Sequence, residues 1–382
     1  MRILLATPLY PPDIGGPATY TKELSERLHG SHDITVVAYA DSPEEIPGIK
    51  LIAISKLEPL PIRLTKYFFA LLKAAKSCDV IFVQNAVAAG LPAMLAGKIR
   101  RKPVCLKFVG DEAWERASQA GLTKKRLEEF LAAPEGNLKI KLFMLIQGLV
   151  LRNVSLVSTP SAYLREELVK AYKVKPQNAI VNYNAADETE VAPFAPQKVS
   201  HQIATTARLV SWKGIDGIIR ATVLVRKKFP DATLVVAGDG PEMENLKRLV
   251  AELHAESFVT LLGRVSRTET WQLRKASDVY VLNSTYEGLP HTVLTSFAAE
   301  IPTVATNIAG TNEAVYHEDT GLLVEPGDDE ALAEAIERYF TEPALCKKVV
   351  ENGTKLLHEK FSWDAHISSL LSSLESLASA RS

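Results

Sequence analysis

Residues 202–240 read QIATTARLVSWKGIDGIIRATVLVRKKFPDATLVVAGDG, and the fold can be predicted by working outward from this stretch. QIATTARL and ATLVVAGD are short apolar runs of the kind that form buried strands, and residues with helical spacing lie between them. Short apolar strands that alternate with helices are typical of a parallel sheet with helices on both faces. The stretch therefore predicts one strand–helix–strand unit of such a sheet.

The same alternation runs through almost the whole chain. The other apolar runs are RILLAT, DITVVAYA, DVIFVQ, PVCLKFVG, SLVSTPS, AIVNYN, FVTLLGRV, DVYVLN, IPTVATN and GLLVEP. Residues 188–200 interrupt the series without apolar periodicity, so we interpret them as a linker. A chain of 382 residues is also too long for one ordinary core. We predict two doubly wound α/β domains, residues 1–190 and 200–360, and a closing helix, 361–382, that packs back toward the first domain.

Composition excludes several classes of protein. Hydrophobic content of 47% with 23% charged residues is typical of a globular protein, and a net charge of −1 argues against nucleic acid as a partner. The 3 cysteines are widely spaced, which argues against a disulfide framework or a zinc site and suits a reducing compartment. The apolar run after Met1 is too short for a signal peptide, and no run approaches the length of a membrane span. We expect a cytoplasmic protein.

The loops at the carboxyl ends of the predicted strands carry the candidate site, because parallel sheets bind ligands at that edge. In LYPPDIGGPATYTKEL, Gly15 and Gly16 let the backbone approach a ligand, and the following helix offers its N-terminus to an anion. A tight turn that needs glycine is the alternative. The fingerprint G-x-G-x-x-G is absent, which disfavours a nicotinamide dehydrogenase.

Charged residues follow two strands of the second half. Arg208 and Lys213 could hold a diphosphate, and the carboxylate of Glu287 could accept hydrogen bonds from sugar hydroxyls. The alternative is solvated surface residues. His291 and Thr295 are four residues apart and share one side of the next predicted helix. Together these residues indicate a pocket for a nucleotide diphosphate sugar.

With these features, the chain resembles the retaining glycosyltransferases of family four (glycosyl transferase group 1). The resemblance covers nearly the whole length and rests on the blocks YPPDIGGPATYTKEL, ARLVSWKGIDGIIRA, VVAGDGP, LLGRV, STYEGLPHTVL and AGTNEAVYHEDTGLLVEPGD. It implies the GT-B fold, in which two Rossmann-like domains face each other across a cleft. It also implies sugar transfer with retention, without a cofactor. The chain has no Asp-x-Asp motif, in agreement with the family's usual metal independence, so no metal site is expected.

The resemblance assigns roles to individual residues. Arg208 and Lys213 would neutralise the donor diphosphate, with help from the Gly16 amide, Val265 would lie beside the base, and Glu287 would contact sugar hydroxyls. The predicted donor-binding residues are Gly15, Gly16, Arg208, Lys213, Val265, Glu287, Gly288, His291, Thr292 and Thr295, and the predicted catalytic residues are Glu287 and Asp111.

Two positions depart from the family pattern. A second Glu is usual eight residues after the first, where it holds the ribose, and here that position is Thr295. Many members have a histidine just before an acidic residue near the transferred sugar, whereas this chain has Gly110 before Asp111. Asp111 can be interpreted in two ways, as a polar residue at the acceptor or as a helix cap. Two other functions therefore stay open, a catalytically silent GT-B protein that binds nucleotide-sugars and a GT-B nucleotide-sugar isomerase.

The partners follow from this interpretation. We expect a UDP- or GDP-sugar as the donor, a glycan or lipid-linked glycan as the acceptor, and no nucleic acid. Residues 98–126 are rich in Lys and Arg and could attract an anionic acceptor, although a solvated face explains them equally well. The stretch NLKIKLFMLIQGLVLR is apolar nearly all round, so we expect a helix buried in the first domain. Peripheral contact with the inner face of the membrane is the alternative.

Overall fold

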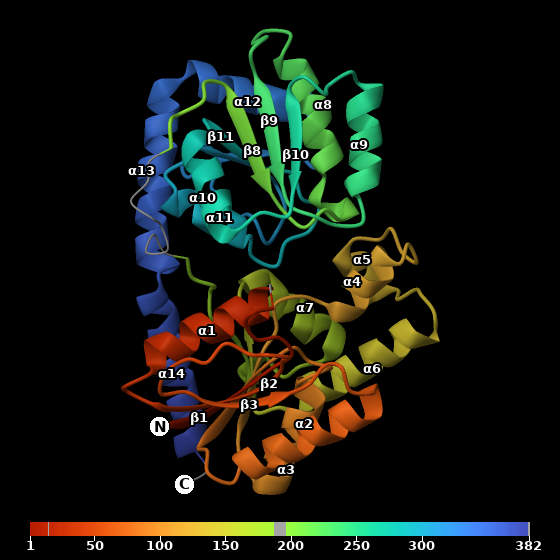
Figure 1. The fold of residues 1–382 in the computed structure, drawn as a ribbon, viewed down its shortest axis with the longest axis vertical. Coiled ribbons are helices and arrows are strands. Elements are labelled where there is room, and N and C mark those ends of the chain that lie inside the picture. The colour runs from red at the N-terminus through yellow and green to blue at the C-terminus, as the bar shows by residue number, and fades with distance from the viewer. Residues whose placement is uncertain (14, 187–195, 381–382) are drawn as a thin grey trace. The chain divides into compact units, whose positions relative to one another are not determined.

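Parallel strands form both sheets of the protein. The structure is a computed structural model that describes residues 1–13, 15–186 and 196–380. Within these ranges the chain forms two compact units, Met1–Asn182 with Ile367–Ser382, and Tyr183–His366. Each unit is a parallel α/β sheet covered by helices, as predicted (Figure 1). Most of the predicted linker, residues 188–200, lies outside the described residues.

The first unit contains a seven-stranded sheet in the order β3-β2-β1-β4-β5-β6-β7. Its strands are β1 (Arg2–Thr7), β2 (Asp33–Tyr39), β3 (Lys50–Ile54), β4 (Val80–Gln84), β5 (Val104–Lys107), β6 (Leu156–Thr159) and β7 (Ala179–Val181). The apolar runs predicted all of these except β3, an edge strand of sequence KLIAI with no buried residue. Its apolar run LIAI, residues 51–54, is a strand signal that the prediction overlooked.

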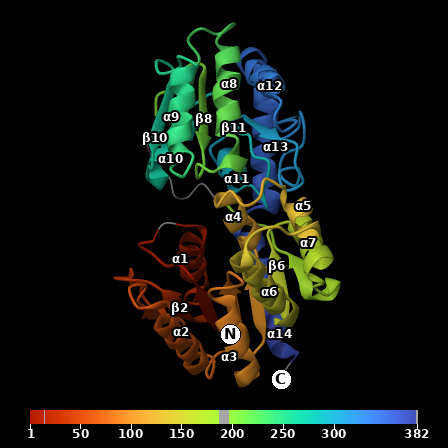
Figure 2. The same ribbon diagram turned by 90° about the vertical axis from the view of Figure 1, so that its right-hand side faces the viewer.

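Helices cover both faces of this sheet (Figures 1 and 2). On one face, α1 (Gly16–Leu28) and α14 (Trp363–Ser379) contribute Leu24, Leu28, Leu370 and Leu374 to a core cluster with the strands. On the other face α2 (Leu60–Ala74) packs against α3 (Gly90–Arg100), and α3 packs against α6 (Leu138–Asn153). The remaining helices are α4 (Glu112–Gln119), α5 (Leu127–Ala132), α7 (Ala162–Tyr172) and the short 3₁₀ helix η1 (Pro176–Asn178).

Helix α6 corrects one expectation. Its buried residues include Ile140, Val150 and Leu151, but Leu138, Leu142, Leu145 and Leu149 are 82, 52, 65 and 44% exposed. The expectation of a buried helix is therefore wrong for one of its sides. The sequence is apolar nearly all round, and only the packing of the neighbouring elements decides which side is covered.

The second unit contains a six-stranded sheet in the order β10-β9-β8-β11-β12-β13. Its strands are β8 (Gln202–Thr206), β9 (Thr233–Ala237), β10 (Val259–Gly263), β11 (Val279–Leu282), β12 (Thr303–Thr306) and β13 (Leu322–Val324). Its helices are η2 (Ser211–Lys213), α8 (Ile215–Val225), α9 (Met243–Glu252), α10 (Arg267–Ala276), α11 (His291–Ala298), α12 (Asp329–Thr341) and α13 (Pro343–Lys360). The direction of strand order reverses between β8 and β11, which is where such sheets bind ligands.

Candidate functional site

The candidate site of the second unit lies at the carboxyl ends of β8 and β11, which are hydrogen-bonded neighbours. The loop after β8 carries Arg208 and Lys213, and the loop after β11 carries Glu287. The parallel sheet thus brings together residues that are 74 positions apart in the chain.

The side chains of Lys213 and Glu287 form an ion pair. Lys213 Nζ lies 2.5 Å from Glu287 Oε1, and the same carboxylate oxygen accepts a hydrogen bond of 2.7 Å from the hydroxyl of Ser284. The side chains of Lys213 and Glu287 are only 19% and 10% exposed. At such low exposure the pair fixes both groups in place more firmly than a surface salt bridge would.

Backbone contacts explain why the two loops meet so closely. Gly214, directly after Lys213, has φ of 59°, and a Cβ at this position would lie 2.2 Å from the carbonyl oxygen of Asn283. The side-chain amide Nδ2 of Asn283 donates to the carbonyl of Gly214 at 2.9 Å, and the backbone amide of Thr285 donates to the carbonyl of Trp212 at 2.8 Å. A glycine is required at 214 for the loops to come together.

The second unit also contains two other predicted donor-binding residues, Arg208 and Val265. Arg208 lies two residues beyond the end of β8, and its side chain is exposed. Val265 is partly buried against a core cluster and precedes Ser266, which caps α10 through a capping box with Glu269. An exposed guanidinium in the same loop as the partly buried Lys213 is a suitable arrangement for an anionic ligand.

Helix α11 holds the remaining residues of the second unit. It begins at His291, directly after Gly288-Leu289-Pro290, and no side chain caps its N-terminus. His291 is exposed, and its Nε2 lies 3.1 Å from the carbonyl oxygen of Ala185, in the same unit. Thr292 and Thr295 are partly exposed, and the hydroxyl of Thr295 donates to the carbonyl of Thr292 at 3.0 Å. The uncapped first turn offers amide groups to an anion.

Gly15 and Gly16 lie at the start of α1 in the first unit. Gly15 is the N-cap residue, so no side chain caps the helix, and its first turn has no acidic residue. A Cβ at Gly16 would have no described atom within 4 Å, and Gly16 is not among the glycines with positive φ. The tight-turn alternative therefore has no support at Gly16, and the open space beside the helix N-terminus suits a ligand.

Asp111 is buried in the first unit and is 1% exposed. It caps α4 by accepting a hydrogen bond of 2.8 Å from the amide of Trp114, and it accepts further bonds from Gln147 at 2.7 Å and from the Tyr172 hydroxyl at 2.5 Å. Burial raises the pKa of this carboxyl above its usual value, although the three hydrogen bonds act in the opposite direction. These contacts favour the helix-cap interpretation of Asp111.

Two polar residues were not predicted from the sequence. Ser284 donates a hydrogen bond to Glu287. In the sequence, the feature that could have indicated this role is the position of Ser284 just after β11 and three residues before Glu287. Lys107 is 5% exposed at the end of β5, with its Nζ 4.3 Å from the centre of the Tyr20 ring. Burial lowers the pKa of Lys107 to about 7. The signal for Lys107 was a lysine inside the apolar run PVCLKFVG.

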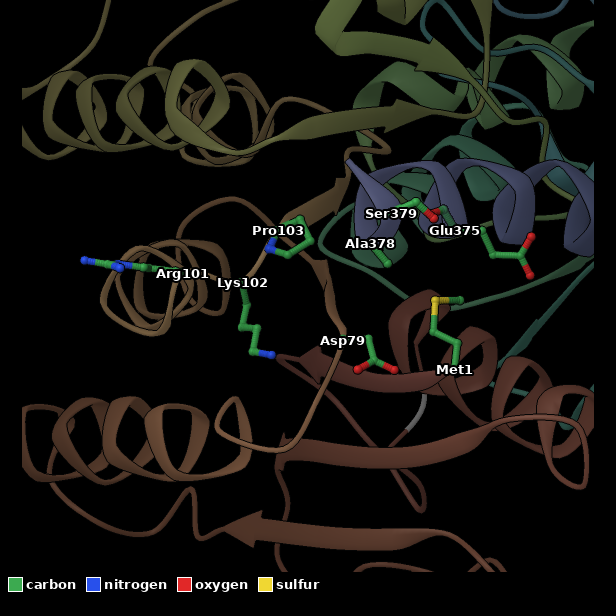
Figure 3. Close-up of a pocket in the computed structure, with 8 residues that line it drawn as sticks. All are labelled: Met1, Asp79, Arg101, Lys102, Pro103, Glu375, Ala378 and Ser379. Atoms are coloured by element: carbon green, nitrogen blue, oxygen red, sulfur yellow. The ribbon is translucent and has the colours of Figure 1, made fainter. Parts of the chain in front are cut away.

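Two pockets are found among the described residues, one in each unit. One pocket of about 430 Å³ lies at the amino ends of the first sheet's strands, away from the carboxyl edge (Figure 3), and is lined by Met1, Asp79, Arg101, Lys102, Pro103, Glu375, Ala378 and Ser379. The carboxylate of Asp79 is paired with Arg2 at 2.6 Å. A pocket of about 460 Å³ in the second unit is lined by residues of α8, α9 and the loop that carries Lys213. None of Arg208, Lys213 and Glu287 is among the residues that line this second pocket.

The described residues contain neither a group of side chains suited to a metal ion nor a helix suited to a membrane span. In residues 1–13, 15–186 and 196–380, no three His, Cys, Asp or Glu side chains are grouped so that they could hold a metal ion. No described helix combines the length and the apolar character needed to cross a bilayer.

Solved structures share the fold of the whole chain. The Anabaena protein HepE in complex with UDP matches with a TM-score of 0.76 at 18% identity, over 98% of this chain and 100% of that one. Sucrose-phosphate synthase from Thermosynechococcus elongatus matches with a TM-score of 0.76 at 19% identity, over 99% of each chain. These neighbours are GT-B glycosyltransferases, so the prediction of the GT-B fold class is confirmed.

Sequence relatives are glycosyltransferases as well. An uncharacterised glycosyltransferase of Methanocaldococcus jannaschii is 26% identical over 95% of each chain. The lipopolysaccharide core biosynthesis glycosyltransferase LpsD of Rhizobium meliloti is 35% identical over 41% of this chain and 43% of its own. Residues 15–185 match the glycosyl transferase 4-like domain, and residues 187–356 match the glycosyl transferases group 1 family. The chain belongs to the glycosyltransferases that combine these two domains.

Proposed function

We propose that the protein transfers a sugar, with retention, from a nucleotide diphosphate sugar to a hydroxyl of a glycan or lipid-linked glycan. The observation that carries this proposal is the Lys213–Glu287 ion pair at the carboxyl edge of the second sheet. It places a cation suited to a diphosphate beside a carboxylate suited to sugar hydroxyls. Family membership supports transfer as the reaction class.

The roles of the residues follow from their chemistry. Arg208 and Lys213 stabilise the negative charge that develops on the leaving diphosphate, the role that a divalent cation has in phosphoryl-transfer sites. We therefore propose that turnover needs no metal. The Gly16 amide at the start of α1 is suited to an anion, and Val265 lies beside the base. Glu287 holds the sugar, and the start of α11 completes the nucleotide pocket.

The chemical step exchanges one bond at the anomeric carbon for another. The bond from this carbon to the β-phosphate oxygen breaks, and its electron pair stays on the phosphate. The acceptor oxygen forms the new bond from the same face, and its proton passes to the leaving phosphate. We propose UDP- and GDP-sugars as donors, and UDP comes first because it is the nucleotide named for HepE.

A panel of UDP- and GDP-sugars with a glycan acceptor, assayed in EDTA, tests the proposal. We expect release of nucleoside diphosphate that depends on the acceptor, and a product with the anomeric configuration of the donor. An isomerase would convert the sugar of the donor without any acceptor. If no such conversion occurs in the absence of acceptor, the isomerase alternative is contradicted. Loss of turnover in EDTA, with recovery in magnesium or manganese, would show that the two cations are not sufficient.

A catalytically silent nucleotide-sugar-binding protein is the second candidate. It is favoured by Thr295, which stands where the family has a Glu and whose hydroxyl donates to its own helix. Thr295→Glu should tighten nucleotide binding about tenfold if this side of α11 faces the ribose, because a carboxylate is the stronger acceptor. Binding without turnover in both the natural protein and this variant would support the silent function.

A further inference from the structure

Ten of the sixteen exposed large apolar side chains of the described residues lie on α2, α3 and α6, which form the α2–α3–α6 layer. Besides the four leucines of α6, they are Leu95 and Ile99 of α3 and residues of α2 that include Leu64 and Phe69. The three helices pack side by side over one face of the first sheet, so residues that they expose point away from that sheet (Figures 1 and 2).

The exposed leucines of α6 form a stripe along the helix. Leu138, Leu142, Leu145 and Leu149 are spaced by four, three and four residues, which places them on one side of an α-helix. Leu95 and Ile99 have the same spacing on the adjacent helix. A contiguous apolar face of this kind marks an interaction surface, whereas single exposed apolar residues do not.

The charge of the same layer is of one sign. The sequences of α2, α3 and α6 contain no Asp or Glu, and their charged residues are Arg63, Lys66, Lys73, Lys98, Arg100, Lys139, Lys141 and Arg152. An acid that meets the layer from outside is Glu58, which pairs with Lys66. Lys141 is one turn before Leu145 and Arg152 is one turn after Leu149, so cations border the apolar stripe.

The opposite face of the same unit gives an internal comparison. Helices α1 and α14, both fully described, expose no large apolar side chain. They also carry acids, among them Glu23 and Glu26 in α1 and Glu375 in α14. The combination of exposed leucines with helices that contain cations and no acid thus belongs to one face of the unit and is not a general property of its surface.

We propose that the outer side of the α2–α3–α6 layer docks on a membrane surface that contains anionic lipid. Exposed leucines enter the boundary between headgroups and acyl chains, while the surrounding Lys and Arg meet lipid phosphates. A second copy of the chain fits this face poorly, because a surface without acids would set cations against cations. This proposal does not depend on the proposed function, although docking would bring a lipid-linked acceptor near the enzyme.

Sedimentation of the full chain with vesicles tests the docking surface. We expect binding to vesicles of phosphatidylcholine and phosphatidylglycerol in equal parts, weaker binding to phosphatidylcholine alone, and loss of binding in high salt. Leu142→Ser with Leu145→Ser should weaken binding roughly tenfold for each leucine. Lys139→Ala with Lys141→Ala should weaken it about fivefold for each cation.

Matched controls come from the second unit. Val199 is 43% exposed, close to the 44% of Leu149, and Lys347 and Lys348 are neighbouring exposed lysines on α13. Val199→Ser and Lys347→Ala with Lys348→Ala should leave vesicle binding unchanged. Because all these positions are exposed, their replacement should not unfold the protein.

Three outcomes overturn the proposal: no binding to anionic vesicles, equal binding by the α6 variants and the natural chain, or equal loss in the controls. A fourth outcome would also overturn it. If sedimentation velocity without vesicles shows that the natural chain is a dimer and that the leucine variant is a monomer, the face joins two copies of the chain. Failure of sugar transfer would leave vesicle binding intact, and the α6 variants should keep transfer to a soluble acceptor.

Discussion

Lys213 and Glu287 are in direct contact, with Nζ 2.5 Å from Oε1, although the sequence assigns one to the diphosphate and the other to the sugar. The contact means that each residue positions the other before any ligand binds. It also means that the carboxylate reduces the positive charge that Lys213 offers to a phosphate. In the proposed function, the exposed Arg208 would supply the second cation for the diphosphate.

The ion pair predicts coupled effects on stability. Lys213→Met leaves the buried carboxylate of Glu287 without its cation, so the free energy of unfolding should fall by about 3 kcal/mol. Adding Glu287→Gln removes the stranded charge and should restore most of that stability, while transfer activity stays low in both variants. Urea unfolding of the single and double variants measures this. A double variant as unstable as Lys213→Met would mean that the pair is not coupled.

Glu287→Gln should separate sugar recognition from nucleotide recognition. The plain nucleoside diphosphate has no sugar to contact, and Lys213 loses its neutralising partner, so nucleotide affinity should be equal or higher. Turnover of the nucleotide-sugar should fall ten- to hundredfold, because a charge-assisted hydrogen bond contributes about 1.5–3 kcal/mol. Calorimetry with nucleotide and a turnover assay provide the comparison. Equal impairment of both would show that Glu287 only supports the loop.

Arg208→Ala should weaken binding of nucleoside diphosphate roughly tenfold or more, because it removes a charge-assisted contact of about 1.5–3 kcal/mol. Stability should not change, since the side chain is exposed. Lys247→Ala is the matched control, because Lys247 is a cation of the same unit that is 57% exposed on α9. If both variants bind nucleotide like the natural protein, the diphosphate is held elsewhere.

Asp111→Ala should lower stability and spare the chemistry. It removes the cap of α4 and leaves the donors of Gln147 and Tyr172 unsatisfied, for a loss of about 2–4 kcal/mol. Turnover per folded molecule should stay within a few-fold of the natural value. The thermal midpoint and kcat at low temperature are the measurements. A fall in kcat by orders of magnitude in a folded variant would return Asp111 to a catalytic role.

Lys107 predicts a pH dependence of stability. Burial lowers its pKa to about 7 in the folded chain, whereas an unfolded lysine titrates near 10.4. Above pH 7 the unfolded chain therefore binds more protons, and stability should rise with pH by at most about 1.4 kcal/mol per unit. Urea midpoints between pH 7 and 8 test this, because burial also raises the pKa values of Cys78 and Cys105, and these thiols act in the opposite direction once unfolded cysteine titrates near pH 8.5.

Lys107→Met is the control for this pH dependence. The variant has no amine to deprotonate, so its midpoint should change less with pH than that of the natural protein. An identical rise in both proteins would mean that other groups cause it.

The sequence by itself determined the class of fold and the edge on which the site lies. Runs such as ATLVVAGD are apolar on both sides because each strand of a parallel sheet is buried on both faces, so they can be identified without any neighbour. The positions of Arg208, Lys213 and Glu287 just after such runs then follow from chain order. The edge strand β3 was overlooked although it carries the short apolar run LIAI, and none of its residues is buried in the structure.

The tertiary structure alone decided which side chains meet and which side of a helix stays open. Lys213 contacts Glu287 because Gly214 lets its loop approach the backbone of Asn283 closely. These two loops follow β8 and β11 and are far apart in the sequence. Asp111 became a buried helix cap because Gln147 and Tyr172 come from other helices. The exposed leucines of α6 were invisible for the same reason: burial is set by the neighbours that pack against a helix, and a sequence that is apolar nearly all round does not say where they are.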